Sequence, residues 1–257
     1  MSTLSFIVIT YNEEKNIARC LESVSSIADE IIVIDSYSND TTELICNQYN
    51  AKFIKRTFTN YADQRNVAFQ LATMDYLFFL DADEALSVNL KNSLLQIKKS
   101  GMQHDIYKVH RFNNFCGKWI KHGMWYPEIL MRMVKKGKGT WYGQVHETLQ
   151  PTVGASVFLL KGDLLHYSYT NIESLVSKLN HYTSLQAVQM FEQNKKAPLF
   201  KLYINPIWAF TNGYFIKLGF LDGWEGYVIH RAIAFQTMIK YAKLRQLIAA
   251  NNVNSSC

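Results

Sequence analysis

The chain contains few of the residues that cross-link or interrupt a fold. Among its 257 residues are only four cysteines, and their spacing fits neither a disulfide framework nor a metal-binding motif. No internal repeat, low-complexity tract or Gly/Ser-rich linker is present. These absences exclude a small disulfide-stabilised protein and a string of tethered domains, and they indicate a reducing compartment.

Long apolar runs and targeting signals are also missing. No window of the C-terminal part offers about eighteen apolar residues without charge, so we expect no membrane-spanning helix. Residues 1–10 lack a positively charged start and a cleavage site, and their apolar stretch fits the first strand of a sheet. The sequence therefore predicts a cytoplasmic protein.

Acidic residues are outnumbered by basic ones. The chain has 27 Lys and Arg against 21 Asp and Glu, which gives a net charge of +6 and an isoelectric point near 9.0. Such a balance favours anionic partners, such as nucleotides, phosphorylated lipids or an acidic membrane face. Nucleic acid would fit the charge alone, but no helix-turn-helix, zinc or aromatic ribonucleoprotein pattern is present, so we expect no nucleic-acid partner.

The first third of the chain alternates between buried-strand patterns and amphipathic helix patterns. Strands are predicted at residues 4–10, 30–35, 52–56 and 77–80. Helices are predicted up to about Ser26, after a cap at Asp40 or Thr41, and near residues 63–72. This alternation predicts an α/β fold whose mainly parallel sheet is built with right-handed crossovers.

Two carboxylates, Asp81 and Asp83, follow the fourth predicted strand directly. In an open α/β sheet, ligands collect at the carboxyl ends of the strands, so both should stand at the mouth of a cleft. The turns after the first two strands, at residues 10–13 and 35–36, should reach the same edge. Two hard oxygen ligands suit Mg²⁺ or Mn²⁺ shared with the phosphates of a ligand. The alternative is an acidic turn followed by a helix cap.

Four motifs of this region resemble those of the family 2 glycosyltransferases, which have the GT-A fold. They are Val8-Ile-Thr-Tyr-Asn-Glu13, Val33-Ile-Asp-Ser-Tyr-Ser-Asn-Asp-Thr-Thr42, Gln64-Arg-Asn66 and Phe79-Leu-Asp-Ala-Asp-Glu84. A further block is similar to the branch that adds sugars to lipopolysaccharide or lipooligosaccharide core. It comprises Trp125-Tyr-Pro127, Arg132, Gly143-Gln-Val-His-Glu147 and Leu165-His166.

The resemblance implies a nucleotide sugar as donor, bound over the ends of the first two strands. Its implied contacts are Thr10, Tyr11, Asn12, Glu13, Asp35, Ser36, Arg65 and Asp81. The family usually has two consecutive acids where this chain has Asp35-Ser36, which leaves the base open, although a UDP-linked sugar is expected. Two alternatives remain open: Asp35 ties its own loop by Asx-type bonds, and Arg65 is a solvated helix residue.

A divalent cation, Mg²⁺ or Mn²⁺, is implied as the partner of the leaving nucleoside diphosphate. Asp83 is the expected direct ligand, and Asp81 is expected at the metal, at its bound water or at the ribose. His166 follows the apolar run 159–165 and is expected to complete the metal site. The alternative is a structural histidine at a strand end.

Sugar transfer with inversion needs one base that deprotonates the acceptor hydroxyl. The resemblance implies Glu147 in this role, with His146 orienting it or contacting the donor. Glu84 is the rival base, although metal support or helix capping is the preferred role for it. A further alternative is that Glu147 only opens a loop before Pro151.

An aromatic and basic segment lies between the two carboxylate sites, and we expect it to bind the acceptor because sugar faces stack on aromatic rings. Its members are Arg111, Phe112, Phe115, Trp119, Lys121, His122, Trp125 and Tyr126. Some of these aromatic side chains must be ordinary core, and we expect Trp119 and Trp125 to divide between the two roles.

Helical patterns replace the alternation from about Asn171. We therefore predict a glycosyltransferase domain at residues 1–170 and a helical C-terminal extension at residues 171–257. Clustered aromatic and basic residues in the extension favour a helix lying in the lipid headgroup region, which would place the protein at the cytoplasmic face of the inner membrane. The alternatives are packing on the sheet or a dimer contact, so an oligomer is possible.

The sequence thus predicts a metal-dependent, inverting glycosyltransferase with a cell-envelope glycan or glycolipid acceptor. One alternative is a sugar-nucleotide nucleotidyltransferase, but such enzymes usually have a Gly-rich loop and a Lys where this chain has Thr10-Tyr-Asn-Glu-Glu14. Another is a non-catalytic sugar-nucleotide-binding protein, against which the joint presence of Asp81, Asp83, Glu147 and His166 argues, because a silent site has no physical need for all four.

Overall fold

Four apolar segments form the parallel half of the main sheet. They are β1 (Leu4–Thr10), β2 (Glu30–Asp35), β3 (Lys52–Lys55) and β4 (Tyr76–Asp81), in the order β3-β2-β1-β4. β1 is buried along its whole length, as expected for a parallel strand that is covered on both faces. The register pairs Thr10 with Asp35 and Ile9 with Asp81, so the carboxyl ends of the three strands meet at one edge.

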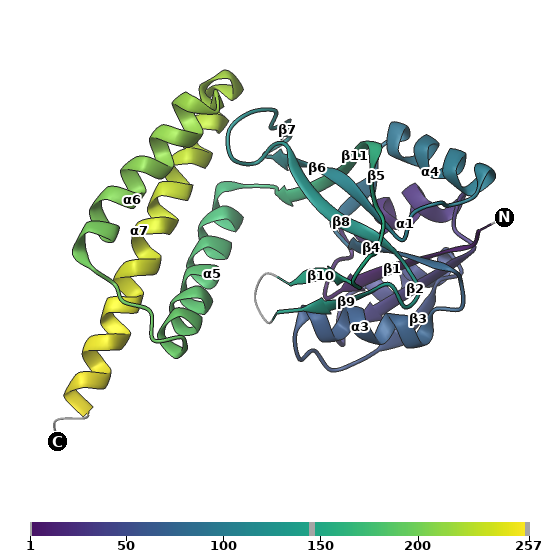
Figure 1. Cartoon of the computed structure of the whole chain (residues 1–257), viewed down its shortest axis with the longest axis horizontal. Coiled ribbons are helices and arrows are strands. Elements are labelled where there is room, and N and C mark those ends of the chain that lie inside the picture. The colour runs from purple at the N-terminus through teal and green to yellow at the C-terminus, as the bar shows by residue number, and fades with distance from the viewer. Residues whose placement is uncertain (1, 144–146, 255–257) are drawn as a thin grey trace. The chain divides into compact units, whose positions relative to one another are not determined.

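These coordinates are a computed structural model that describes residues 2–143 and 147–254, with side chains up to residue 251. The chain divides into two compact units (Figure 1). Unit 1 comprises residues 1–112 and 128–167, and unit 2 comprises residues 113–127 and 168–257. Unit 2 therefore includes a segment, 113–127, that lies inside the predicted glycosyltransferase domain.

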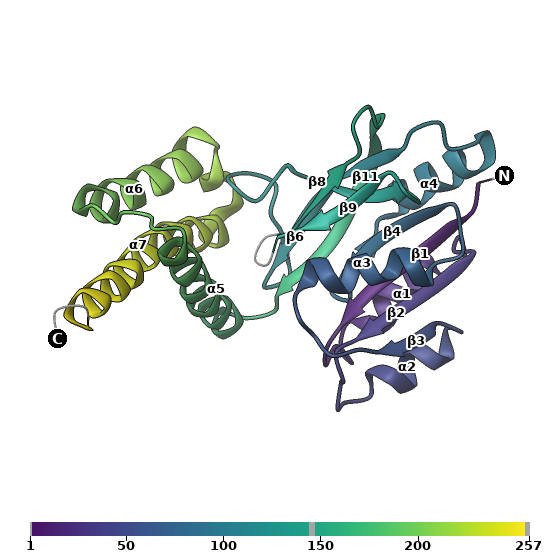
Figure 2. The same cartoon turned by 60° about the horizontal axis from the view of Figure 1, so that its bottom comes forward.

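Helices cover both faces of the sheet in unit 1 (Figure 2). Alternate side chains of β1 point to opposite faces, so Phe6 and Val8 share one core with α1 (Ile17–Ser25) and α4 (Val88–Ser100). Ile7 lies in the other core with α3 (Tyr61–Leu71). α2 (Thr42–Gln48) contributes Cys46 to the first core. The predicted α/β arrangement is confirmed.

Antiparallel strands complete the sheet beyond β4. β8 (Glu128–Lys135) pairs with β4 and with β6 (Ile106–Phe115), and the order continues through β11 (Val157–Tyr169) to β5 (Glu84–Leu86). β7 (Lys118–Trp119) pairs with β6, and a separate hairpin joins β9 (Gly139–Tyr142) to β10 (Thr148–Pro151). β11 and β5 pair His166 with Glu84, which brings two sequence-distant site candidates into register.

Helix capping agrees with one prediction, at Asp40, and differs from another, at Glu84. Ser87, not Glu84, caps α4, because its hydroxyl accepts the backbone N–H of Leu90 at 3.2 Å. The capping role considered for Glu84 is therefore wrong. At α2 the carboxylate of Asp40 accepts the N–H of Thr42 at 3.0 Å, whereas the side chain of Thr41 donates to Glu14.

Unit 2 is mainly helical, as predicted for the C-terminal part of the chain. It contains α5 (Ile172–Glu192), α6 (Leu199–Thr211), a π-helical turn η1 (Asn212–Ile216), a 3₁₀ turn η2 (Gly219–Asp222) and α7 (Gly223–Asn254). α7 packs against both α5 and α6. Among the described residues, no helix is long and apolar enough to cross a membrane.

A buried histidine organises the start of α7. His230 is fully buried, its Nδ1 contacts the carbonyl of Gly226 at 2.6 Å, and its Nε2 accepts the backbone N–H of Met124 at 3.2 Å. A Cβ atom at Gly123, Gly213 or Gly219 would collide with the imidazole ring. The ring therefore occupies space that only glycine leaves open.

Candidate active site

The loop after β2 is tied down by Asp35. This buried carboxylate accepts both the hydroxyl of Ser38 and its backbone N–H, the latter at 2.8 Å. The N–H of Ser36 donates to the carbonyl of Thr10 at 3.0 Å and joins the ends of β1 and β2. The Asx-type bonds of Asp35 are thus present, and contacts of Asp35 and Ser36 with a nucleotide stay predictions.

The loop after β1 lies against the loop after β2. Asn12 adopts a left-handed conformation with φ 53°, donates its N–H to the hydroxyl of Ser38 at 2.8 Å, and accepts the N–H of Asn39 at 2.9 Å. Glu13 accepts the side-chain amide of Asn16 at 2.8 Å, just before α1. Both residues therefore shape the loop, whereas the ring of Tyr11 is 58% exposed at the same edge.

Thr10 presents an unusual polar group at the end of β1. Its side chain is buried, and its hydroxyl has no hydrogen-bond partner within the described part of the chain. Buried hydroxyls in native proteins are normally satisfied. The hydroxyl is thus buried and unpaired among the described residues, and a contact of Thr10 with a nucleotide stays a prediction.

Arg65 lies at the centre of the site. Its side chain is 3% exposed, its Nη2 binds Asp81 Oδ1 at 2.6 Å, and its Nη1 binds Glu147 Oε1. The guanidinium also stacks over the indole of Trp141, 4.5 Å from the ring centroid. The alternative that Arg65 is a solvated helix residue is therefore wrong, and three residues from distant parts of the sequence meet at this point.

A second guanidinium, that of Arg132 on β8, holds the other side of Asp81. Arg132 Nη2 lies 3.1 Å from Asp81 Oδ2 and 2.6 Å from Glu84 Oε1. Glu84 in turn accepts the backbone N–H of Asp81 at 3.0 Å. Both oxygens of Asp81 are thus engaged by arginines, and Glu84 is buried beneath the turn that carries Asp81 and Asp83.

The two acidic side chains of this cluster respond in opposite directions. Burial opposes the ionisation of Asp81, but the charges of Arg65 and Arg132 outweigh it and hold the pKa of Asp81 well below its usual range. Burial raises the pKa of Glu84, the nearby Asp81 carboxylate adds to the rise, and Arg132 opposes it. Asp81 is therefore a permanent anion, whereas Glu84 is the carboxyl of the pair that accepts a proton more readily.

Arg111 on β6 belongs to the same network of ion pairs. Its Nε and Nη2 bind the two carboxylate oxygens of Glu128, each at 2.8 Å, and its Nη1 lies 3.6 Å from Glu84 Oε1. The planar, bidentate geometry is the strong form of this ion pair. Its expected contact with an acceptor stays a prediction.

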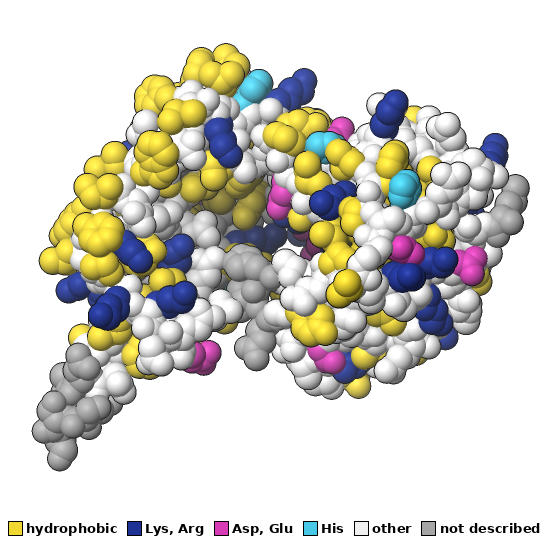
Figure 3. Space-filling model, viewed as in Figure 1, with side chains coloured by type: hydrophobic (Ala, Val, Ile, Leu, Met, Phe, Trp, Pro, Cys, Tyr) yellow, Lys and Arg dark blue, Asp and Glu magenta, His cyan; other side chains and the backbone are white. Residues whose placement is uncertain are grey.

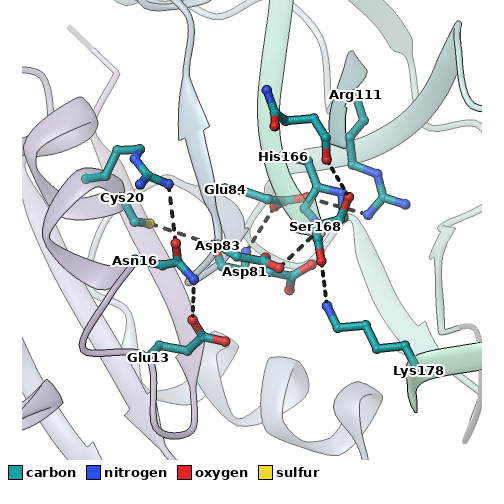
Figure 4. Close-up of polar contacts among 12 residues, drawn as sticks. Glu13, Asn16, Cys20, Asp81, Asp83, Glu84, Arg111, His166, Ser168 and Lys178 are labelled. Atoms are coloured by element: carbon teal, nitrogen blue, oxygen red, sulfur yellow. Dashed lines mark hydrogen bonds and ion pairs between the residues drawn. The ribbon is translucent and has the colours of Figure 1, made fainter. Parts of the chain in front are cut away.

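Asp83, in the turn between β4 and β5, faces His166 on β11 (Figure 4). Asp83 Oδ2 lies 3.4 Å from His166 Nε2, and both side chains are 15% exposed. The carbonyl of Asp83 accepts the N–H of Tyr167 at 2.9 Å, so β11 fixes the position of the turn. Two of the three residues expected as metal ligands therefore lie side by side.

The donor atoms suit a cation that arrives with phosphates better than a metal held by the protein alone. Within residues 2–143 and 147–254 no group of three or more His, Cys, Asp or Glu side chains could hold a metal ion. Mg²⁺ is usually bound by one or two carboxylates together with substrate phosphates. Asp83 and His166 fit such a site, whereas the arginines occupy both oxygens of Asp81.

Cys20 lies below the same turn and is chemically inert. Its thiol is fully buried and contacts the carbonyl of Asp81 at 3.8 Å. Burial raises the pKa of Cys20 well above its usual value, and the charges of Glu84, Asp83 and Asp81 raise it further. A thiolate nucleophile is therefore disfavoured at this site.

Sequence reasoning missed the ion pairs that Arg65 and Arg132 form with the acidic side chains. Arg132 was noted only as part of the resemblance, although a single arginine in the apolar strand 128–135 is a signal for a buried partner. Arg65 and Glu147 are 82 positions apart, so only the fold reveals their contact. His146, expected to orient Glu147, lies outside the described residues.

Two aromatic residues of the expected acceptor segment, Phe115 and Trp125, lie in the core of unit 2. Phe115 is fully buried, and Trp125 stacks on Tyr169 with ring centroids 5.3 Å apart. His122 Nδ1 contacts the buried carboxylate of Asp222 at 3.1 Å. Trp125 is therefore a packing residue, and contacts of this segment with an acceptor stay predictions.

Several known proteins are similar in sequence to this chain over nearly its whole length. An uncharacterized glycosyltransferase of Rickettsia typhi is 33% identical over 268 residues, which cover 100% of this chain and 91% of that protein. The lipopolysaccharide core biosynthesis glycosyltransferase LpsC of Rhizobium meliloti is 28% identical and covers 98% of this chain and 97% of LpsC. The class of protein is thus a glycosyltransferase.

Residues 5–162 match the family description "Glycosyl transferase family 2", and the chain belongs to this family. Its α/β sheet with flanking helices and a helical C-terminal part is of the GT-A type. A crystal structure of glucosyl-3-phosphoglycerate synthase from Mycobacterium tuberculosis, in complex with Mn²⁺, UDP and glucosyl-3-phosphoglycerate, has a TM-score of 0.37 and 21% identity to it, covering 44% of each chain.

Proposed function

We propose that this glycosyltransferase is metal-dependent and inverting. In this proposal it moves a sugar from a nucleotide sugar, with UDP as the expected nucleotide, to a cell-envelope glycan or glycolipid such as lipopolysaccharide core. Residues 1–170 form its catalytic domain in this proposal. The observation that carries it is the meeting of Arg65, Asp81 and Glu147 beside the Asp83–His166 pair at the carboxyl edge of the sheet.

The donor binds over the loops that follow β1 and β2. Tyr11 offers an exposed ring, and Thr10, whose side chain is buried, contacts the donor through its backbone. Asn12, Glu13, Asp35 and Ser36 shape this surface, and their backbone groups are the remaining candidates for contacts with base and ribose. Arg65 adds positive charge near the diphosphate, while its Nη1 and Nη2 atoms stay bound to Glu147 and Asp81.

Asp83 and His166 hold the divalent cation, Mg²⁺ or Mn²⁺, in this proposal. When bound, such a cation neutralises the charge that develops on the leaving diphosphate. Asp81, fixed between Arg65 and Arg132, faces the ribose or a water of the cation. Arg132 acts through Asp81 and Glu84, so it is a positioning residue.

Glu147 is the proposed base. Arg65 holds one of its oxygens, and this contact orients the carboxylate at the edge of the donor site. A carboxylate so placed takes the proton of the acceptor hydroxyl as that oxygen attacks the anomeric carbon. Attack from the face opposite the diphosphate inverts the configuration at that carbon. Glu84 is the poorer base, because it is fully buried and bonded to Arg132 and to the backbone of Asp81.

The acceptor class is supported by the likeness of the whole chain to LpsC, whose name places it in lipopolysaccharide core biosynthesis. An acceptor of this kind is anchored in a membrane. We therefore propose that the protein works at the cytoplasmic face of the inner membrane, in peripheral contact with the bilayer.

A donor screen tests the proposal. The full chain is incubated with a panel of UDP-, GDP- and CMP-linked sugars, with Mn²⁺, with Mg²⁺ or with EDTA, and released nucleotide is measured with and without lipopolysaccharide core acceptors. We expect release from one UDP-sugar that needs the cation and rises with the acceptor, and a product of inverted anomeric configuration. Full activity in EDTA would reject the metal, and retained configuration would reject the single-base mechanism.

A further inference from the structure

Helix α6 turns its apolar side chains toward solvent, unlike an ordinary helix on the surface of a soluble protein. Its large apolar side chains point outward and are 53–65% exposed; they are Leu199, Phe200, Tyr203, Ile204, Ile207 and Trp208. They recur in adjacent pairs every four residues, which places them on one face of the helix. All of Leu199–Thr211 is described, and none of its residues is buried. Helices on soluble surfaces normally turn polar residues outward.

The same face continues through the next turns of the chain. Phe215, Ile216, Leu218, Phe220, Leu221 and Trp224 are 43–60% exposed on η1, η2 and the first turn of α7. We call the exposed side chains of residues 199–224 the apolar face. Figure 3 shows hydrophobic side chains gathered over α6 and the neighbouring turns. Soluble proteins rarely leave a contiguous apolar surface of this extent without a partner.

Charge around the apolar face is uniformly positive. Residues 193–221 contain four lysines and neither Asp nor Glu. Unit 2 as a whole has eleven Lys and Arg against four Asp and Glu, whereas unit 1 has sixteen against seventeen. The excess positive charge of the protein therefore belongs to the unit that carries the apolar face.

Two acidic side chains close to the apolar face in sequence are engaged inside unit 2. Asp222 is 3% exposed and accepts the backbone N–H of His122 at 2.8 Å. Glu225 binds Lys118 Nζ at 3.1 Å. Both carboxylates therefore turn toward unit 2, and the excess of lysine in residues 193–221 favours an anionic partner.

We propose that the apolar face inserts into the headgroup region of an anionic lipid bilayer, with the lysines around it binding lipid phosphates. Aromatic and aliphatic side chains on one side of a helix, flanked by lysine, are the composition of an interfacial helix. This inference deepens the peripheral membrane contact that rests on the proposed function, and it names the surface that makes that contact.

A second copy of the chain is a poorer occupant. A two-fold symmetric contact packs the same surface of both copies against itself, so the lysines of residues 193–221 would face one another. Like charges opposed in this way weaken association, whereas the phosphates of an anionic bilayer attract the same lysines.

Vesicle flotation tests the inference with the full chain. Purified protein is mixed with vesicles of phosphatidylcholine alone or of phosphatidylcholine with phosphatidylglycerol. We expect flotation with the anionic vesicles, partial release by high salt, and a blue shift of tryptophan fluorescence from Trp208 and Trp224. I204D/I207D should lower the vesicle-bound fraction at least about tenfold, because it places charges where two exposed isoleucines would enter the bilayer.

The matched control is V88D/V153D, which adds the same charge at two exposed valines of unit 1. We expect it to float like the unmodified protein, and both variants should keep their circular dichroism spectrum. Equal flotation of I204D/I207D and the unmodified protein would overturn the inference, as would failure of the unmodified protein to bind anionic vesicles. Dimers that I204D/I207D dissociates, without vesicle binding, would also overturn it and assign the face to self-association.

The assay needs neither donor nor acceptor, so its result is separate from that of the donor screen. Flotation without sugar transfer would reject the proposed function and leave the membrane surface standing. Transfer to a water-soluble acceptor without flotation would do the reverse.

Discussion

The two units of this protein distribute charge and apolar surface in opposite ways. In unit 1 the acids and arginines at the strand ends form ion pairs, of which Arg132–Glu84 is buried, while apolar side chains fill two cores. In unit 2 the basic side chains outnumber the acidic ones, and the apolar side chains of residues 199–224 face outward. Buried charge and exposed apolar surface both cost stability or solubility. Each unit departs from the usual distribution where we place its function.

The largest effect is expected at the turn that carries Asp83. Asp83→Ala should reduce sugar transfer to the background rate and weaken nucleotide binding in the presence of metal, while the melting temperature stays near that of the unmodified protein. A strand-end carboxylate contributes little to packing, so chemistry and stability should separate. Initial rates, calorimetric binding of UDP and a thermal melt measure the three quantities. Normal turnover of Asp83→Ala in EDTA would show that the carboxylate of Asp83 does not act by binding a metal.

The base should show a smaller effect on the rate and none on donor affinity. Glu147→Gln keeps the shape of the side chain and removes its basicity, so turnover should fall by roughly two to four orders of magnitude. The amide oxygen can still accept from Arg65, and donor binding should persist. Steady-state rates and UDP-sugar binding are compared. Loss of donor affinity with an unchanged rate would make Glu147 a donor ligand.

Arg132 should matter for stability more than a surface arginine does. Arg132→Met removes the partner of the buried carboxylate of Glu84 and of the half-buried Asp81, and should lower the free energy of unfolding by about 3–5 kcal/mol. Urea denaturation of the full chain measures this loss. As the control, Arg132→Met combined with Glu84→Gln should recover part of the stability, since one uncompensated charge is gone. Equal stability of the single variant and the unmodified protein would mean that the buried network is not a stabilising feature of unit 1.

The smallest effect is expected at His166. Loss of one ligand should raise the Mn²⁺ concentration for half-maximal activity of His166→Ala by at least roughly tenfold, because loss of even an outer-shell partner of a metal ligand typically weakens metal binding by about that factor. Saturating metal should restore most of the rate. A metal titration with His166→Gln as the control measures the shift, and superimposable curves would return His166 to a structural role.

Much of unit 1 could be predicted because its sequence signals are local. The apolar runs of β1, β2 and β4 and the turns after them set the strand ends, and the predicted bounds differ little from those observed. The adjacency of Asp83 and His166 followed from a family resemblance, and the pairing of β5 with β11 supplies its physical cause.

The arginine network could not be predicted, because it depends on strand pairing over long sequence distances. β8 pairs with β4 antiparallel, with Phe78 opposite Met133, and this register brings Arg132 to Asp81. No local pattern fixes that register. The outward apolar face was equally hidden: the sequence shows a cluster of aromatic and aliphatic residues, but the packing of α6 on α7 decides which side of the helix meets water.

The imidazole of His230 limits which amino-acid substitutions the residues around it can tolerate. Gly123, Gly213 and Gly219 border the ring so closely that a methyl group on any of them would overlap it, and the ring also bonds the backbone of Met124 and Gly226. A side chain at any of the three glycines would therefore require the imidazole to move, and at Gly219 the carbonyl of Gly213, 2.8 Å from the same Cβ position, would have to move as well. A smaller side chain at position 230 would leave a cavity and would deprive the N–H of Met124 of its acceptor. Each of these four positions is therefore expected to tolerate little change on its own.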